Sequence, residues 1–285
     1  MIARGTLTLL VALTACRGKD EPAVERRPTV ELDTIPRLES VRLLAPGTGD
    51  RQLLRYTLAA PSTHAIETTV TARQLEGAAW SEPRTLPPMQ SGFTVTPASD
   101  ALRVRTLPGT TTGAWALIAD RTFSITSDDR GRASAFAIAD QGASGAAIVD
   151  ELAQRWLALV VPLPEEPVAV GATWRAVTVL RQRPAIVKQT ATYTLTSRTA
   201  ERWEIGVELS RVAAPQQAID PGVPEGTQVD VVALVTRLGG TLAIDPRRPL
   251  PTGELTLTST LHLRLRGAAG VTEQIYDDTA IVRAR

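Results

Sequence analysis

Much of the chain alternates between apolar and polar residues with a period of two, which is typical of β-strands with one buried face. The longest such pattern covers residues 254–266. One face of this predicted strand carries five leucines (Leu255, Leu257, Leu261, Leu263 and Leu265). The other face carries polar side chains (Thr256, Thr258, Thr260, His262, Arg264 and Arg266). Because successive side chains of a strand point to opposite faces, this stretch predicts a long strand over an apolar core.

Shorter patterns of the same kind predict strands from Leu53 onward, separated by Pro, Gly and Asp. After Trp174 the segments TWRAVTVLR, AIVKQTATYTLTSR and RWEIGVELSRV predict an antiparallel meander. Residues 127–131 predict a hairpin turn, which should join a strand with Phe123 and Ile125 to a strand with Phe136 and Ile138. A second turn is predicted at Gly239-Gly240.

One segment, at about residues 145–161, has the period of an amphipathic helix instead. Ile148, Leu152 and Trp156 recur on one face, and Ser144 is a candidate N-cap because its hydroxyl can accept a backbone N–H. The helix should end before Pro162, since proline disfavours helical geometry at the preceding residue.

The apolar stripe of a single helix must be buried against another element, here a sheet. Ile148, Leu152, Trp156 and Trp174 are therefore predicted to contact either the protein core or an apolar ligand, and core packing is the favoured alternative.

These patterns predict a mainly β fold of the β-rich α+β class with one main helix. Its strands should form a broad curved antiparallel sheet or two packed β regions. The expected organisation is a signal peptide at residues 1–15, a flexible tether at 16–37, a first β region at 38–142, the helix and return loop at 143–174, and a second β region at 175–285.

The N-terminus carries an export signal. Arg4 precedes an apolar run at residues 7–13, as in a signal peptide. Leu13-Thr14-Ala15-Cys16 resembles the bacterial lipobox, which implies cleavage before Cys16 and lipid on its sulfur. The alternative is an ordinary secretory signal with an incidental cysteine. The resemblance implies a lipid-anchored protein of the bacterial cell envelope. Arg17 stands where an inner-membrane lipoprotein of enterobacteria has Asp, so we expect the outer membrane, facing the periplasm.

Composition excludes several classes of function. The 31 basic and 30 acidic residues are scattered, whereas nucleic-acid binding needs a basic stripe. A single cysteine allows neither an internal disulfide nor a thiolate metal cluster. The two histidines, His64 and His262, lie apart and have no metal-binding spacing.

No constellation of catalytic residues is visible in the sequence. Asp128 and Asp129 fit ordinary turn chemistry better than a catalytic or calcium site. The adjacent pairs Glu165/Glu166 and Asp277/Asp278 should point to opposite faces if they lie on strands, which makes them poor acid–base partners. We therefore predict no enzymatic activity, no cofactor and no metal.

Residues 162–174, PLPEEPVAVGATW, resemble a segment found between the β-rich halves of uncharacterised bacterial lipoproteins. No activity carries over from that family, so the resemblance implies only a fold and a location. A broad sheet covered by one helix is also similar to the half-barrel of periplasmic lipoprotein carriers, a comparison of folds and not of function.

Two functions remain open. The first is a structural or interaction lipoprotein that docks an envelope protein partner. The second is a module that holds a lipid or other apolar ligand between the concave sheet and the central helix. A filled core and an apolar pocket use the same residues, and the first function is favoured because filled cores are commoner.

Overall fold

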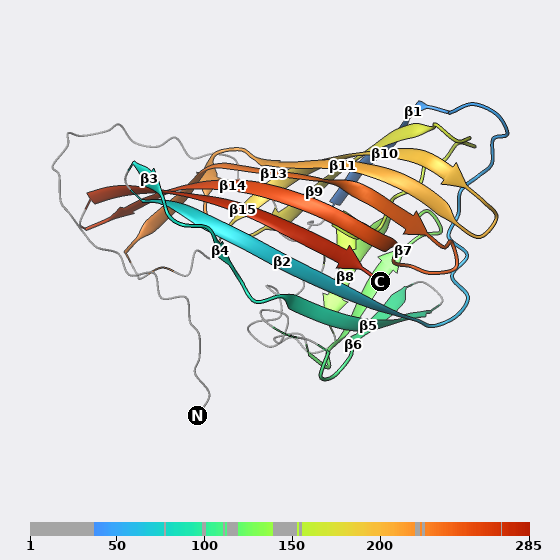
Figure 1. Ribbon diagram of the computed structural model, residues 1–285, viewed down its shortest axis with the longest axis horizontal. Coiled ribbons are helices and arrows are strands. Elements are labelled where there is room, and N and C mark those ends of the chain that lie inside the picture. Colours follow the sequence, from blue (N-terminus) through green and yellow to red (C-terminus); the bar gives the residue numbers. More distant parts are fainter. Residues whose placement is uncertain are drawn as a thin grey trace.

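The computed structural model describes residues 37–76, 78–98, 101–110, 112, 119–138, 153, 156–219, 223, 226–268 and 270–285. Within these residues, 15 strands form one antiparallel sheet (Figure 1). The predicted mainly β fold is therefore confirmed.

The strands follow the chain in short and long segments. They are β1 (Arg37–Ala45), β2 (Ser62–Glu76), β3 (Ala79–Trp80), β4 (Arg84–Thr85), β5 (Met89–Pro97), β6 (Leu102–Thr106), β7 (Thr122–Ser127), β8 (Ala133–Ile138), β9 (Thr173–Gln182), β10 (Ala185–Arg198), β11 (Trp203–Ala213), β12 (Gln216–Gln217), β13 (Gln228–Ile244), β14 (Thr252–Gly267) and β15 (Gly270–Ala284).

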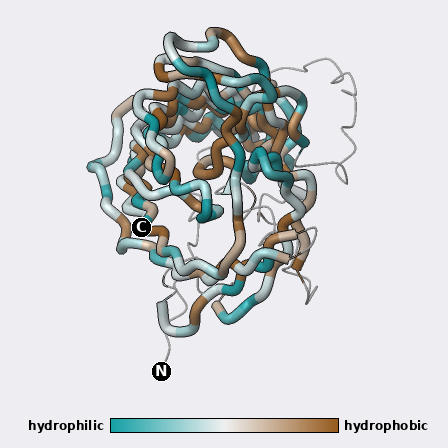
Figure 2. Tube along the Cα trace, turned by 90° about the vertical axis from the view of Figure 1, so that its right-hand side faces the viewer, coloured by the Kyte–Doolittle hydropathy of each residue, from teal (hydrophilic) through white to brown (hydrophobic). Residues whose placement is uncertain are grey.

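The two predicted β regions belong to a single sheet. Its order is β1-β9-β10-β11-β13-β14-β15-β2-β5-β6-β7-β8, so strands of the first region flank the second on both sides. The end strands β1 and β8 contact each other, which makes the curved sheet nearly closed. In the end view of Figure 2 the strands run around a common interior. The alternative of one broad curved sheet is therefore the correct one.

The inner face of the sheet holds the core, and the outer face is polar. In β14, Leu255 is buried, while Glu254 and Thr256 on either side of it are exposed, as the alternating pattern predicts. The outer face is crossed by ion pairs between neighbouring strands, such as Arg283 with Glu254 at 2.8 Å. Exposed pairs of this kind contribute little stability, so burial on the inner face is what holds the sheet together.

The prediction of a turn at Gly239-Gly240 is wrong. Both glycines lie within β13, where Gly239 pairs with Glu208 and Gly240 with Val207. The chain turns later, between β13 and β14. Gly240 has a φ of 156°, and a Cβ there would lie 2.3 Å from the carbonyl oxygen of Glu254 on β14. The glycine therefore serves a close approach of two strands rather than a reversal of the chain.

The hairpin predicted at residues 127–131 is confirmed. Phe123 pairs with Ile138, and Ile125 pairs with Phe136. Asp128 accepts hydrogen bonds from the backbone N–H groups of Arg130 and Arg132 with its Oδ1, at 3.0 Å each. This is the turn chemistry expected for aspartate.

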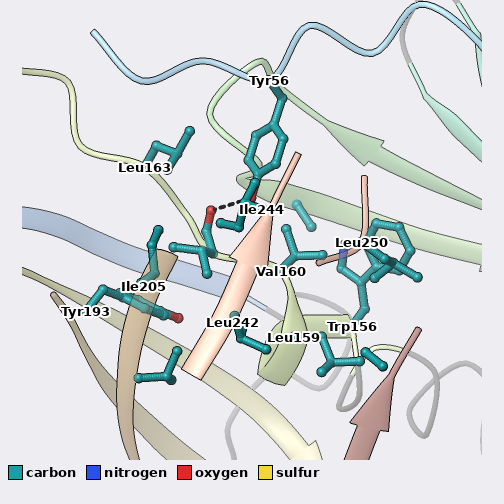
Figure 3. Packing of buried hydrophobic residues seen from close by; sticks show 14 of the residues in the cluster. Tyr56, Trp156, Leu159, Val160, Leu163, Tyr193, Ile205, Leu242, Ile244 and Leu250 are labelled. Carbon is teal, nitrogen blue, oxygen red and sulfur yellow. Dashed lines mark hydrogen bonds between the residues drawn. The ribbon is translucent and has the colours of Figure 1, made fainter. Parts of the chain in front are cut away.

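The described part of the central helix is its last turn. Residues 156–159 are helical, and the N–H of Val160 still donates to the carbonyl oxygen of Trp156 at 2.8 Å. Trp156, Leu159 and Val160 are buried among core residues (Figure 3). The described helical residues contain no segment long and apolar enough to cross a membrane.

The return loop that follows the helix is buried and tied to its surroundings. The Tyr56 hydroxyl donates to the carbonyl oxygen of Val161 at 3.1 Å, as Figure 3 shows. Val168 exchanges two backbone hydrogen bonds of 2.9 Å with Gln52. Gly171 ends the loop with a φ of 83°, a conformation that glycine adopts without strain.

Candidate functional site

A row of polar side chains crosses the inner face of the sheet, at right angles to the strands. Each member pairs in register with the next on the adjacent strand, from β9 to β15. We call these residues the polar row: Thr178, Gln189, Arg211, Thr236, Ser259 and Asp278. Thr178, Gln189, Arg211 and Thr236 are buried, although polar side chains are rare in a protein core unless they are hydrogen-bonded.

Hydrogen bonds connect most of the row. Arg211 Nε donates to Gln189 Oε1 at 2.8 Å, and its Nη1 donates to Oε1 of the neighbouring Gln182 at 3.3 Å. Gln182 Nε2 donates to Thr236 Oγ1 at 3.1 Å. Thr236 Oγ1 lies 2.9 Å from Ser259 Oγ. The chain of bonds therefore runs from β10 to β14 and ends beside Asp278.

The row also holds the end of the helix. Gln189 Nε2 donates to the carbonyl oxygen of Leu157 at 3.1 Å. The carbonyls of the last helical turn have no partner within the helix, so this bond satisfies one of them. The same glutamine thus links the helix to the sheet and to Arg211.

The polar row divides the inner face into two apolar clusters. In β13, Leu234 precedes Thr236 and belongs to the smaller cluster, while Leu238 follows it and belongs to the larger one. The smaller cluster consists of Leu180, Ala185, Val187, Ala213, Val231 and Leu234. The interior is therefore not one continuous core.

A cavity of about 250 Å³ lies between the polar row and the larger cluster. Its apolar wall includes Leu238, Leu255, Leu257, Ala280 and Val282. The end of the helix closes it with Ala158 and Leu159. Its polar wall consists of Gln182 together with Arg211, Ser259 and Asp278 of the row. The cavity therefore has one apolar and one polar side.

Asp278 differs from the rest of the polar row. The register places its side chain on the inner face, while its neighbour Asp277 points outward and contacts Arg73 at 2.9 Å. Within the described part of the chain, the Asp278 carboxyl group makes no hydrogen bond and no ion pair. Burial and, to a smaller extent, the charge of Asp277 raise the pKa of Asp278. The prediction that these two aspartates point to opposite faces is confirmed.

Two of the residues predicted to line a core or a ligand site are described, and both pack in the core. Trp156 is 4% exposed and Trp174 is 0% exposed. The Nε1–H of Trp174 donates to the carbonyl oxygen of Pro162 at 2.8 Å, and its ring stacks on Tyr193. Neither tryptophan lines the cavity among the described residues. Cys16, Ile148 and Leu152 lie outside the described residues.

A second hollow, of about 420 Å³, lies on the outer face behind the polar row. Threonines of β2, β14 and β15 line it together with Arg73, Arg237 and Asp277. Asp277 is already bonded there, to Arg73 and to the hydroxyl of Thr260 at 2.7 Å. Because its charged groups are exposed and its lining is polar, the outer hollow is a weaker candidate than the inner cavity.

Neither histidine is part of a metal site. The described residues contain no group of three or more potential metal ligands among His, Cys, Asp and Glu. His262 on the outer face lies 3.0 Å from Glu273. His64 is 3% exposed on the inner face, where its Nε2 lies 2.7 Å from Ser62 Oγ. Burial, assisted by the charge of Arg248, lowers the pKa of His64 to about 4.

His64 should make the stability of the fold depend on pH. In the unfolded chain it takes up a proton near pH 6.5, whereas the folded state resists protonation until about pH 4. The unfolded state therefore binds more protons between these values, and the free energy of unfolding should fall by at most about 3 kcal/mol as pH drops across this window. Urea unfolding at a series of pH values measures the slope. His64→Gln should flatten it, and His262→Gln should leave it unchanged.

Sequence reasoning missed the polar row and the cavity. A signal was present in each strand: a single polar residue interrupts the apolar face, as Ser259 does between Leu257 and Leu261. The register between strands, which the sequence does not display, is what aligns these interruptions. A comparison with models of known protein families and with curated proteins finds no match for this chain.

Proposed function

We propose that the protein is a membrane-anchored envelope protein that binds an apolar ligand in the cavity between its curved sheet and the end of its central helix. The observation that carries this proposal is the 250 Å³ cavity itself, which has an apolar wall and a helical cover. A merely structural protein has no need for such a space, because a cavity costs stability.

The size of the cavity limits the ligand. An apolar cavity of about 150 Å³ binds benzene, and pockets for small molecules typically range from about 300 to 1,000 Å³. The present cavity falls between these values. A single acyl chain or a compound with one or two rings fits better than a lipid with several chains.

A variant that fills the cavity tests the proposal. Ala280 is buried on the apolar wall, so Ala280→Phe should occupy much of the space. Thr279→Phe places the same side chain on the outer face of the same strand and serves as the matched control. We expect a bound apolar compound in native mass spectra of the wild-type chain and of Thr279→Phe. In Ala280→Phe this compound should be absent while the thermal transition is retained.

If wild-type protein carries no ligand and binds neither dodecanol nor dodecanoic acid after extraction with organic solvent, the binding function is wrong. The structural or interaction function, in which the protein docks an envelope partner, would then be the better explanation. Loss of the ligand from both variants would also count against the cavity as its site.

The proposed anchor rests on the lipobox-like residues 13–16 and on the apolar run before them. Several acyl chains on one residue suffice for stable attachment to a membrane. Cys16→Ala should therefore move the protein from the membrane fraction to the soluble fraction, measured by immunoblotting after ultracentrifugation. A variant that remains in the membrane fraction under high salt would contradict the lipid anchor. Outer-membrane location is tested by separating the two membranes on a density gradient.

A further inference from the structure

The polar wall of the cavity contains two charged side chains, which lie on opposite sides of it. Arg211 comes from β11, and Asp278 comes from β15, with β13 and β14 between them. A ligand that fills the apolar side of the cavity would present its polar end to this wall. The chemistry of the wall should therefore select the head of the ligand.

Arg211 is already engaged by the protein. Its Nε and Nη1 donate to the side-chain oxygens of Gln189 and Gln182. These bonds hold the guanidinium within the polar row, and Gln189 is in turn held by the helix end through Leu157. The position of Arg211 is explained by its structural role.

Asp278 has no such role. Its carboxyl group lines the cavity and makes no hydrogen bond or ion pair within the described part of the chain. Buried carboxylates are costly unless they are paired or hydrogen-bonded. The same burial raises the pKa of this group, which shows that the charge is disfavoured in the unliganded protein. A cationic group placed beside it would remove that cost.

We propose that Asp278 is the head-group recognition residue of the cavity and that the ligand is a single-chain amphiphile with a cationic, hydrogen-bond-donating head such as a primary amine. This inference rests on the proposed function, since it names the class of ligand for the same cavity. Ser259, the neighbour of Asp278 on β14, supplies a hydroxyl at the same polar wall. The apolar chain lies along Leu238, Leu255 and Leu257.

Three probes that share one alkyl chain separate the contribution of the head from that of the tail. Dodecylamine, dodecanol and dodecanoic acid are compared by displacement of the neutral fluorophore N-phenyl-1-naphthylamine from the full chain carrying Cys16→Ser, which needs no detergent. Hydrogen bonds to charged groups contribute enough for about a tenfold or larger preference. Dodecylamine should therefore bind about tenfold more tightly than dodecanoic acid, with dodecanol between them.

Asp278→Asn should lower the affinity for dodecylamine about tenfold and leave the affinity for dodecanol nearly unchanged. Asp277→Asn is the matched control, because it removes the adjacent carboxylate from the outer face and should preserve the preference for the amine. A wild-type protein that binds all three probes equally, or prefers dodecanoic acid, overturns the inference but leaves the binding function intact. A wild-type protein that binds none of the three overturns the proposed function as well. The wild-type comparison decides the matter even if Asp278→Asn does not fold.

Discussion

Replacement of Trp174 by alanine is expected to lower the free energy of unfolding by about 4 kcal/mol. The side chain is fully buried, stacks on Tyr193 with ring centroids 5.7 Å apart, and donates a hydrogen bond to Pro162. Alanine removes the packing and leaves the carbonyl oxygen of Pro162 without this donor. Since Pro162 begins the return loop, the loss should loosen the connection between the helix and β9.

Urea unfolding followed by circular dichroism measures this cost. Trp174→Phe retains most of the packing but loses the donor, so it should cost only about 1 to 2 kcal/mol. Trp80 is 40% exposed and rests on Arg73, so Trp80→Ala should cost less than about 1 kcal/mol. Equal losses for the two alanine variants would show that the return loop does not depend on Trp174.

Replacement of Arg211 by alanine is expected to cost about 3 to 5 kcal/mol. Arg211 is 2% exposed, and its removal would leave the side-chain oxygens of Gln189 and Gln182 without their donor. It would also release Gln189, which holds the last turn of the helix. The variant should therefore lose helix docking as well as overall stability.

The comparison with Arg211→Met separates these effects, because methionine retains the apolar stem but none of the donors. We expect Arg211→Met to be less destabilised than Arg211→Ala, and both to lose protection of the Val160 amide in hydrogen exchange. Arg237 on β13 is exposed on the outer face, so Arg237→Ala should change stability by no more than about 0.5 kcal/mol. A stable Arg211→Ala variant with a protected helix end would contradict the structural role of the polar row.

The fold was largely predictable because its signal is local. Alternation in residues 254–266 and in the three segments after Trp174 correctly predicts β14, β9, β10 and β11. The error at Gly239-Gly240 has a physical origin: glycine permits both a tight turn and a close approach of backbones, and only the position of Glu254 distinguishes the two.

The site was less predictable because it depends on register. Thr178, Gln189 and Arg211 are more than ten residues apart in the chain, and each interrupts an apolar face only once. A shift of one residue in any pairing would move its side chain to the outer face. The sequence therefore predicted the helix as a cover for the sheet, but the cavity lies beside Ala158 and Leu159 rather than beside Trp156.

The strand order also determines when the sheet can be completed. Ile66 of β2 pairs with Ala284 of β15, and Leu43 of β1 pairs with Trp174 of β9. Domains dominated by pairings between distant parts of the chain fold slowly, because loop closure must precede the contacts that reward it. Until residue 284 has been synthesised, β2 and β14 both lack a neighbour and present open edges, which are sites of aggregation. A chain of this topology therefore benefits from a chaperone that shields these edges until synthesis is complete.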